Sequence, residues 1–221
     1  RDRLRSRGLG DVYKRQAMSK LKKFYPIPFE IEAITVDLGF KDFDTSRLKE
    51  YCESLGVNYT VCKTHIGEIV FDYRKEPNPC SLCSRMRKGA FNDCAAELGC
   101  NKIAYAHHKD DVIDSFLMSM LYEGRIHTFS PVTHLEKSGV TLIRPLIYVL
   151  EGEIRAFARA NDLPVCKNPC PADGVTKRQE SKDIIDELKL RVPDVKDRIF
   201  SSIEGAGIDG WSRPVSYTHL R

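Results

Sequence analysis

The stretch Ile103-Ala104-Tyr105-Ala106-His107-His108-Lys109-Asp110-Asp111 decides the fold class. Its apolar first half passes directly into histidines and two acidic residues, which is typical of a buried strand that ends where a helix begins. From 110 to 122, apolar residues recur at helical spacing. The stretch therefore predicts a strand-to-helix junction. In open α/β sheets, the carboxyl edge of the strands is where ligands bind.

Strand and helix patterns alternate on both sides of this junction. Strands are predicted at 29–36, 59–62 and 102–106, and a hairpin at 132–134 with 141–143. Helices are predicted at 44–55, 81–98, 110–122, 151–161, 181–190 and 195–202. This alternation predicts an α/β fold of the Rossmann-like kind, with a mainly parallel sheet, helices on both faces and a helical C-terminal extension.

Length and composition narrow the class of protein. The chain has 221 residues, eight cysteines and a formal net charge of +4. Its length predicts one domain with a core of its own. We expect no membrane span, because no run of about 18 apolar residues occurs. The many cysteines and the charged start, which is unlike a secretory leader, indicate reduced thiols and a cytoplasmic location.

Both ends of the chain lack the patterning of the middle. Residues 1–16 and 214–221 resemble translated sequencing-adaptor read-through, so we expect both to be artefacts. The native domain is then expected at 17–205, with a tail at 206–221. Residues 1–16 carry six Lys or Arg and two Asp, and so account for the whole net charge. The net positive charge of the chain is therefore no evidence for nucleic-acid binding.

The acidic pair at the junction has two interpretations. Asp110 and Asp111 would stand at a helix start, where paired carboxylates suit a magnesium ion that carries nucleotide phosphates. In the structural interpretation, Asp110 caps the helix and Asp111 favours its dipole. His107 and His108 are likewise more often structural than catalytic. The residues alone leave both interpretations open.

A pair of cysteines three positions apart forms the second candidate site. Cys80 and Cys83 precede a basic cluster of Arg85, Arg87 and Lys88. The positive charge favours thiolates and could hold phosphate or an RNA backbone, although a solvated face is an equal alternative for each basic residue. Redox chemistry, a zinc site and an iron–sulfur site are all compatible with the pair.

The chain resembles the tRNA 2-thiocytidine synthetase family of PP-loop ATP pyrophosphatases over residues 17–205. Four features carry the resemblance, in this order: Cys-Ser-Leu-Cys-Ser-Arg-x-Arg-x-Gly (80–89), His-His-x-Asp-Asp (107–111), Ile-Arg-Pro-Leu (143–146), and a distal cysteine motif followed by Arg178-Gln179. The resemblance implies an ATP-dependent tRNA sulfurtransferase. Such an enzyme adenylates a tRNA base, here a cytidine, and replaces the activated oxygen with sulfur.

The resemblance also implies a [4Fe–4S] cluster held by three cysteines. Cys80 and Cys83 match the first two ligands. The distal motif usually reads Cys-x-x-Cys-Gly, but here it reads Cys-Lys-Asn-Pro-Cys-Pro (166–171). Counting back from Arg178-Gln179 favours Cys170 as the third ligand, with Cys166 as the alternative. A four-thiolate zinc site stays open as well.

Further roles follow from the same resemblance. Asp110 or Asp111 would hold Mg²⁺ and Arg87 would stabilise phosphate charge, which makes these three the expected catalytic residues. Asp37, His107 and His108 are expected at the ATP site. The expected partners are tRNA, ATP and a sulfur donor (a cysteine desulfurase or sulfide), with a homodimer as one option.

One departure from the family concerns the phosphate loop. The family binds ATP phosphates with a Ser-Gly-Gly-x-Asp-Ser loop after its first strand, and the sequence contains neither that loop nor a Walker-type motif. We therefore expect a fragment without its first strand, unable to bind ATP tightly and inactive alone. Two alternative functions are a lysidine-synthetase-like tRNA-modifying enzyme, which needs no cysteine cluster, and a non-enzymatic zinc module that binds RNA.

Overall fold

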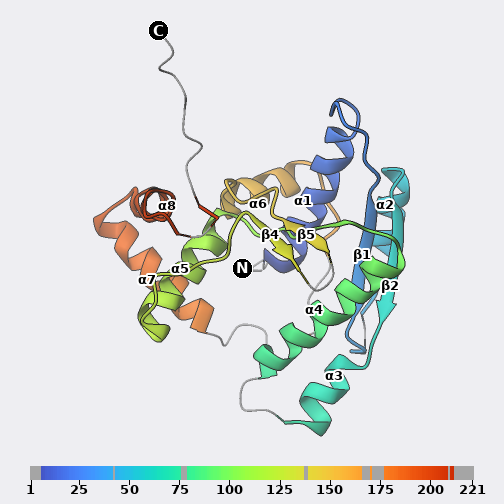
Figure 1. The fold of residues 1–221 in the computed structure, drawn as a ribbon, viewed down its shortest axis with the longest axis horizontal. Helices are drawn as coiled ribbons and strands as arrows, with labels where there is room; N and C mark the ends of the chain where they lie inside the picture. Colours follow the sequence, from blue (N-terminus) through green and yellow to red (C-terminus); the bar gives the residue numbers. More distant parts are fainter. Residues whose placement is uncertain are drawn as a thin grey trace.

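The computed structural model describes residues 6–41, 43–75, 79–136, 139–165, 170, 177–208 and 210–211. Its β-structure falls into two sheets (Figure 1). In the first, β1 (Glu32–Asp37) pairs in parallel with β2 (Asn58–Lys63). The second has the order β3-β5-β4, in which β3 (Lys102–Ala104) is parallel to β5 (Val140–Ile143) and β4 (Val132–Leu135) is antiparallel to it.

Helices surround these two sheets. Their bounds are α1 (Ser6–Leu21), α2 (Ser46–Ser54), α3 (Ile66–Glu68), the π-helical turn η1 (Ile69–Tyr73), α4 (Pro79–Glu97), α5 (Lys109–Glu123), α6 (Glu151–Ala160), α7 (Lys177–Arg191) and α8 (Val195–Gly205). Figure 1 shows α5, α7 and α8 grouped on one side of the β3-β5-β4 sheet and β1, β2 and α2 on the other.

Four apolar clusters hold the layers together, and the smallest consists of Ala33, Cys52 and Val57. Ile103 and Leu142, from adjacent strands, pack with Ala95 of α4. Helices α1, α2 and α6 share a second cluster, which includes Leu48 and Ile154. The largest joins α5, α7 and α8, and its buried members are Val112, Ile113, Leu117, Ile147, Ile185, Phe200, Ile203 and Trp211. This largest cluster is the core of the predicted helical C-terminal extension.

The predicted α/β class, the parallel pairing and the helices on both faces are confirmed. Each predicted strand and helix is present, with ends that differ by a few residues. The short helical stretch 66–73 was missed, because its apolar residues are too few to show a helical repeat.

Residues 1–16 show no apolar periodicity, yet α1 begins at Ser6 in their described part. Val12 is buried against α6, and the Tyr13 ring meets the Phe157 ring edge-on at 4.8 Å. Contacts with the rest of the fold therefore hold this helix, and its own apolar periodicity is weak. The origin of these residues and the domain limits stay predictions.

No backbone ladder joins β1 to β3 within the described ranges. Each strand is the last in its own sheet, so one edge of β1 and one edge of β3 have no strand partner there. Ile34 of β1 nevertheless packs against the cluster around Ile103. The two sheets are thus neighbours through side chains.

Candidate functional site at the carboxyl ends of β3 and β5

The junction between β3 and α5 is fixed by a capping box. His108, only 2% exposed, is the N-cap of α5. Its Nδ1 accepts a hydrogen bond from the Asp111 backbone N–H at 3.3 Å, and its own backbone N–H donates to Asp111 Oδ2 at 3.1 Å. Two amides that a helix start leaves unsatisfied are therefore paired. The capping role thus falls to His108 and Asp111, whereas the structural interpretation gave the cap to Asp110.

Asp110 ties the same helix start to two other helices. Its Oδ2 accepts from the backbone N–H of Glu151, the first residue of α6, at 2.7 Å. Its Oδ1 pairs with Lys196 Nζ of α8 at 2.6 Å. On the neighbouring position, Lys109 pairs with Asp197 of α8. Both oxygens of Asp110 are thus engaged, and a magnesium ion would have to displace Lys196. The magnesium role stays a prediction.

The charge network changes the acidity of its members. Burial raises the pKa of Asp110, but the hydrogen bonds from the Glu151 amide and Lys196 outweigh burial, so that pKa lies below its ordinary value of 3.8. For Glu151, burial is outweighed by Lys182 and Arg155, and its pKa lies below 4.5. The pKa of Lys196 is raised by Asp110, against burial. All three groups are therefore stabilised in their charged forms.

This network predicts a loss of stability in acid. Because the folded-state pKa values of Asp110 and Glu151 lie below their ordinary values, both contribute stability fully above pH 4.5 and lose it as the pH falls through the folded-state values. Thermal unfolding between pH 7 and pH 3 should show the midpoint falling in that window. In Asp110→Asn the acid-side fall should be shallower; an unchanged profile would contradict the role given to Asp110.

The cysteine pair lies at the start of α4. Cys80 and Cys83 are three positions apart on this helix and both are half-buried, so their sulfurs share one face. Cys170 is also half-buried. Among the described residues, no three His, Cys, Asp or Glu side chains gather closely enough to hold a metal ion. The pair fits two ligand positions, and Cys166 lies outside the described residues.

The expected nucleotide-binding residues lie at strand ends. Asp37 is the last residue of β1, and its Oδ1 accepts from the Gly39 backbone N–H at 2.9 Å. Gly39 has φ +79°, and a Cβ there would lie 2.8 Å from Thr64 O, so the turn after β1 requires glycine. His107 follows β3, between the Tyr105 and Phe129 rings at 5.5 and 4.7 Å. The structure thus brings His107, but not Asp37, beside the α5 junction.

Sequence reasoning missed the residues around Arg144. Arg144 directly follows β5 and is only 9% exposed. Its Nη1 donates to Ser130 O and, at 3.1 Å, to Thr133 Oγ1, and its guanidinium lies 4.9 Å from the Phe129 ring centroid. The signal in the sequence was Ile-Arg-Pro-Leu itself: an arginine placed at the end of an apolar strand.

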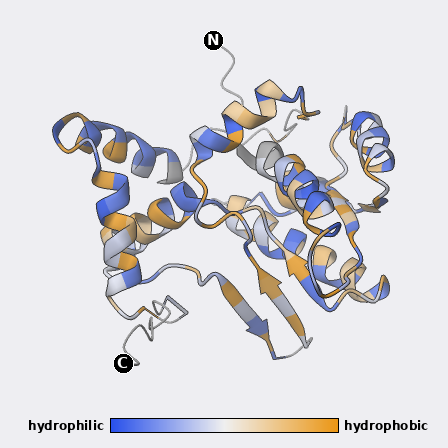
Figure 2. Cartoon of the chain, turned by 90° about the horizontal axis from the view of Figure 1, so that it is seen from above, coloured by the Kyte–Doolittle hydropathy of each residue, from blue (hydrophilic) through white to orange (hydrophobic). Residues whose placement is uncertain are grey.

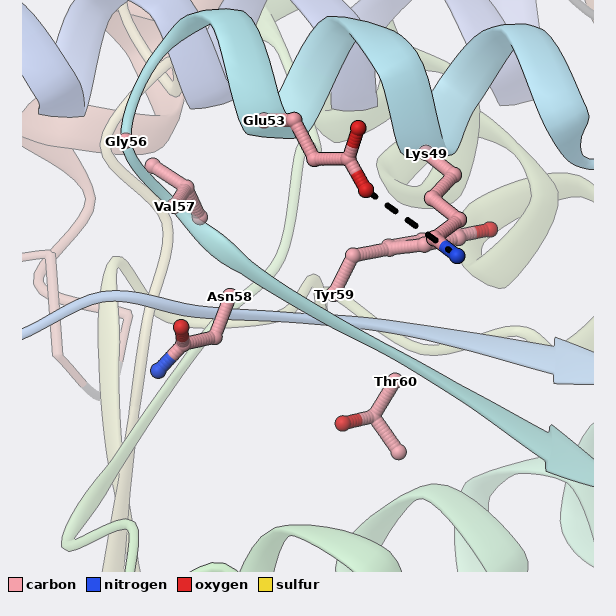
Figure 3. Close-up of a pocket in the computed structure, with 7 residues that line it drawn as sticks. All are labelled: Lys49, Glu53, Gly56, Val57, Asn58, Tyr59 and Thr60. Carbon is pink, nitrogen blue, oxygen red and sulfur yellow. Dashed lines mark ion pairs between the residues drawn. The ribbon is translucent and has the colours of Figure 1, made fainter.

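A cavity of about 520 Å³ lies away from this edge (Figure 3). Its lining comes from the end of α2, the following turn and the start of β2: Lys49, Glu53, Gly56, Val57, Asn58, Tyr59 and Thr60. It lies at the amino end of the strand, and none of the expected site residues lines it. The carboxyl edge therefore remains the candidate site.

Hydrophilic residues recur along the helices in Figure 2. Within the described residues, none of the helices combines the length and the hydrophobicity that crossing a membrane requires.

Comparison with known families agrees with this arrangement of strands and junction residues. The family model described as the PP-loop domain matches residues 12–180. The fold and the carboxyl-edge site therefore define a PP-loop protein.

Within that class, the chain is 31% identical over 190 residues to the tRNA-cytidine(32) 2-sulfurtransferase of Citrifermentans bemidjiense, covering 84% of this chain and 74% of that protein. It is 32% identical over 192 residues to the enzyme of the same name from Syntrophotalea carbinolica, covering 84% and 73%. It is 34% identical over 186 residues to the enzyme of the same name from Ralstonia nicotianae, and the match covers 83% of this chain and 60% of that enzyme. The chain belongs to this family of tRNA sulfurtransferases.

A solved structure supports the same assignment. The U34-tRNA thiolase NcsA from Methanococcus maripaludis, solved with its [4Fe-4S] cluster, superposes with a TM-score of 0.73 and 25% identity, over 91% of this chain and 69% of that one. The predicted family and the predicted α/β fold are thus confirmed.

Proposed function

We propose that this chain takes part in ATP-dependent thiolation of a tRNA cytidine, in the cytoplasm. In this reaction a base oxygen attacks the α-phosphorus of ATP, pyrophosphate leaves, and sulfur then replaces the adenylated oxygen as AMP leaves. The observation that carries the proposal is the match over four-fifths of the chain to enzymes named for this product. The cysteine pair on α4 is a second support.

The proposed roles follow the geometry of the carboxyl edge. His107, held between two aromatic rings, would contact the nucleotide or the target base. Arg87, half-buried on α4, would neutralise phosphate charge. The structure adds that Asp110 positions the α5 and α6 starts through its two bonded oxygens. Positioning and charge neutralisation would supply most of the rate.

Cys80 and Cys83 fit two ligands of a [4Fe–4S] cluster, because the i, i+3 spacing on α4 puts two thiols on one face. Three cysteine ligands would leave one iron with an open coordination position, and that iron could carry a sulfur atom. Cys170 is the proposed third ligand. A cysteine desulfurase or sulfide would be the sulfur source, and Mg²⁺ would accompany ATP.

Metal analysis tests this proposal. Anaerobic reconstitution should give roughly four irons and inorganic sulfide per chain, with broad visible absorbance. Cys80→Ala and Cys170→Ala should lose the cluster, while Cys166→Ala, the matched control, should keep it. The reverse result for the last two variants would move the third ligand to Cys166. Tight zinc without inorganic sulfide would instead support the zinc module and exclude the cluster.

A further inference from the structure

The guanidinium of Arg144 is a buried cation without an acidic partner in the part of the chain that the structure describes. No carboxylate among the described residues forms an ion pair with it, and its Nε has no hydrogen-bond partner there. The contacts it makes are to a carbonyl, a hydroxyl and an aromatic face. A buried charge is costly unless an opposite charge meets it. Among the described residues, no anion therefore balances this charge.

A second arginine, Arg87, belongs to α4, the helix that packs against β3. Ala104 of β3 is opposite Ile143 of β5, so the next residues, Tyr105 and Arg144, are neighbours at the carboxyl edge. The Tyr105 backbone N–H donates to Ile143 O at 2.9 Å, which holds this register. Burial raises the pKa of the Tyr105 phenol, while Arg144 and Arg87 both lower it. Arg87 lies one turn before Phe91 on α4, and the Phe91 ring centroid is 5.9 Å from that of Tyr105, so this part of α4 lies beside the same residue.

We propose that Arg144 and Arg87, on either side of Tyr105, form a subsite for one phosphate group. Guanidinium groups bind phosphate oxygens with paired N–H donors, and the phenol can add a further hydrogen bond. The unpartnered Nε of Arg144 provides a donor for this purpose. The inference rests on the proposed function for the source of the phosphate, which is the RNA backbone or the nucleotide.

The RNA backbone is the source that the charges favour. Arg85 and Lys88 are exposed on α4, on either side of half-buried Arg87 in the sequence, and would extend the positive charge outward from the subsite. A nucleotide phosphate would need no such extension. The subsite would then fix one phosphate near the target base, while His107 and Phe129 lie alongside.

Thermal unfolding with inorganic phosphate tests the subsite without relying on activity. Phosphate should raise the melting temperature of the wild-type chain, and Arg144→Gln should abolish that rise. The matched control is Arg159→Gln, an exposed arginine at the end of α6, which should keep it. Arg144→Lys retains the charge without the guanidinium fork, so it should retain part of the effect. If Arg144→Gln does not fold, Arg87→Gln and Arg144→Lys carry the test.

Salt titrations assign the source. With an anticodon stem-loop RNA, Arg144→Gln or Arg87→Gln should reduce the slope of log affinity against log salt by about 0.7–0.9, the value for one phosphate. An unchanged RNA salt slope in variants that have lost the stabilisation by inorganic phosphate would assign the phosphate to the nucleotide. The proposal of a subsite would be overturned if Arg144→Gln and Arg87→Gln fold, are stabilised by phosphate as the wild type is, and show the wild-type salt slope for RNA binding. If the wild-type chain binds no RNA, the proposed function fails, and the inorganic phosphate result still decides the subsite.

Discussion

Replacing Trp211 with alanine should lower the free energy of unfolding by about 3–5 kcal/mol. The Trp211 side chain is 2% exposed and belongs to the cluster that joins α5, α7 and α8. Its ring meets the Phe200 ring edge-on at 5.4 Å, and its Nε1 donates to Phe129 O at 3.1 Å. The substitution removes a large apolar contact and leaves a carbonyl unpaired, and these two losses add.

Urea unfolding followed by circular dichroism measures this loss, because Trp211 is the single tryptophan and its fluorescence disappears with it. Leu190→Ala is the control: Leu190 is 86% exposed, and its removal should change the free energy by no more than about 0.5 kcal/mol. The loss of unfolding free energy in Trp211→Phe should lie between those of the two alanine variants, because phenylalanine keeps the ring contact and loses the hydrogen bond. Equal effects of Trp211→Ala and Leu190→Ala would contradict the packing role.

Replacing Asp110 with alanine should cost about 2–3 kcal/mol, because two hydrogen bonds to a charged, buried carboxylate are lost together. The side chain is 8% exposed, whereas its partner Lys196 is 30% exposed. Lys196 can therefore turn to solvent when the carboxylate is gone, which keeps the cost below that of a fully buried pair. The Glu151 amide has no such alternative.

Two further variants separate these contributions in the same unfolding assay. Asp110→Asn can still accept from the Glu151 amide, so it should lose less than alanine does. Lys196→Met removes only the ion pair and should cost about 1 kcal/mol. A double-mutant cycle between Asp110→Ala and Lys196→Met then measures the coupling between the two side chains. A coupling energy of zero would show that the Asp110–Lys196 ion pair adds nothing to stability.

The strands and helices could be predicted because each follows from local pattern. Val112, Ile113 and Leu117 repeat at helical spacing and are buried in α5, and Gly124, in the left-handed conformation at φ +62°, ends that helix. The strand-to-helix junction at His108 was visible for the same reason. Helix α1 was missed because it is held by distant contacts such as that between Tyr13 and Phe157.

The site could be predicted only in part. The sequence singled out Asp110 and His108 but left their roles open, because the deciding partners, Lys196 and Glu151, are far away in the chain. Arg144 was quoted as part of a motif, yet its burial, with no acidic partner among the described residues, depends on how three strands meet. Pairings of this kind are set by tertiary packing, and no local periodicity encodes them.

The division of the sheet has a consequence for cooperativity. A two-stranded ladder is marginal by itself, so β1 and β2 depend on the helices that cover them. The buried cluster on this side has only Ala33, Cys52 and Val57, whereas the α5–α7–α8 side has a much larger one. Without a continuous ladder, the two halves share little backbone hydrogen bonding. The β1–β2–α2 part is therefore the unit expected to open first, as a separate foldon, while the carboxyl edge of β3 and β5 stays folded.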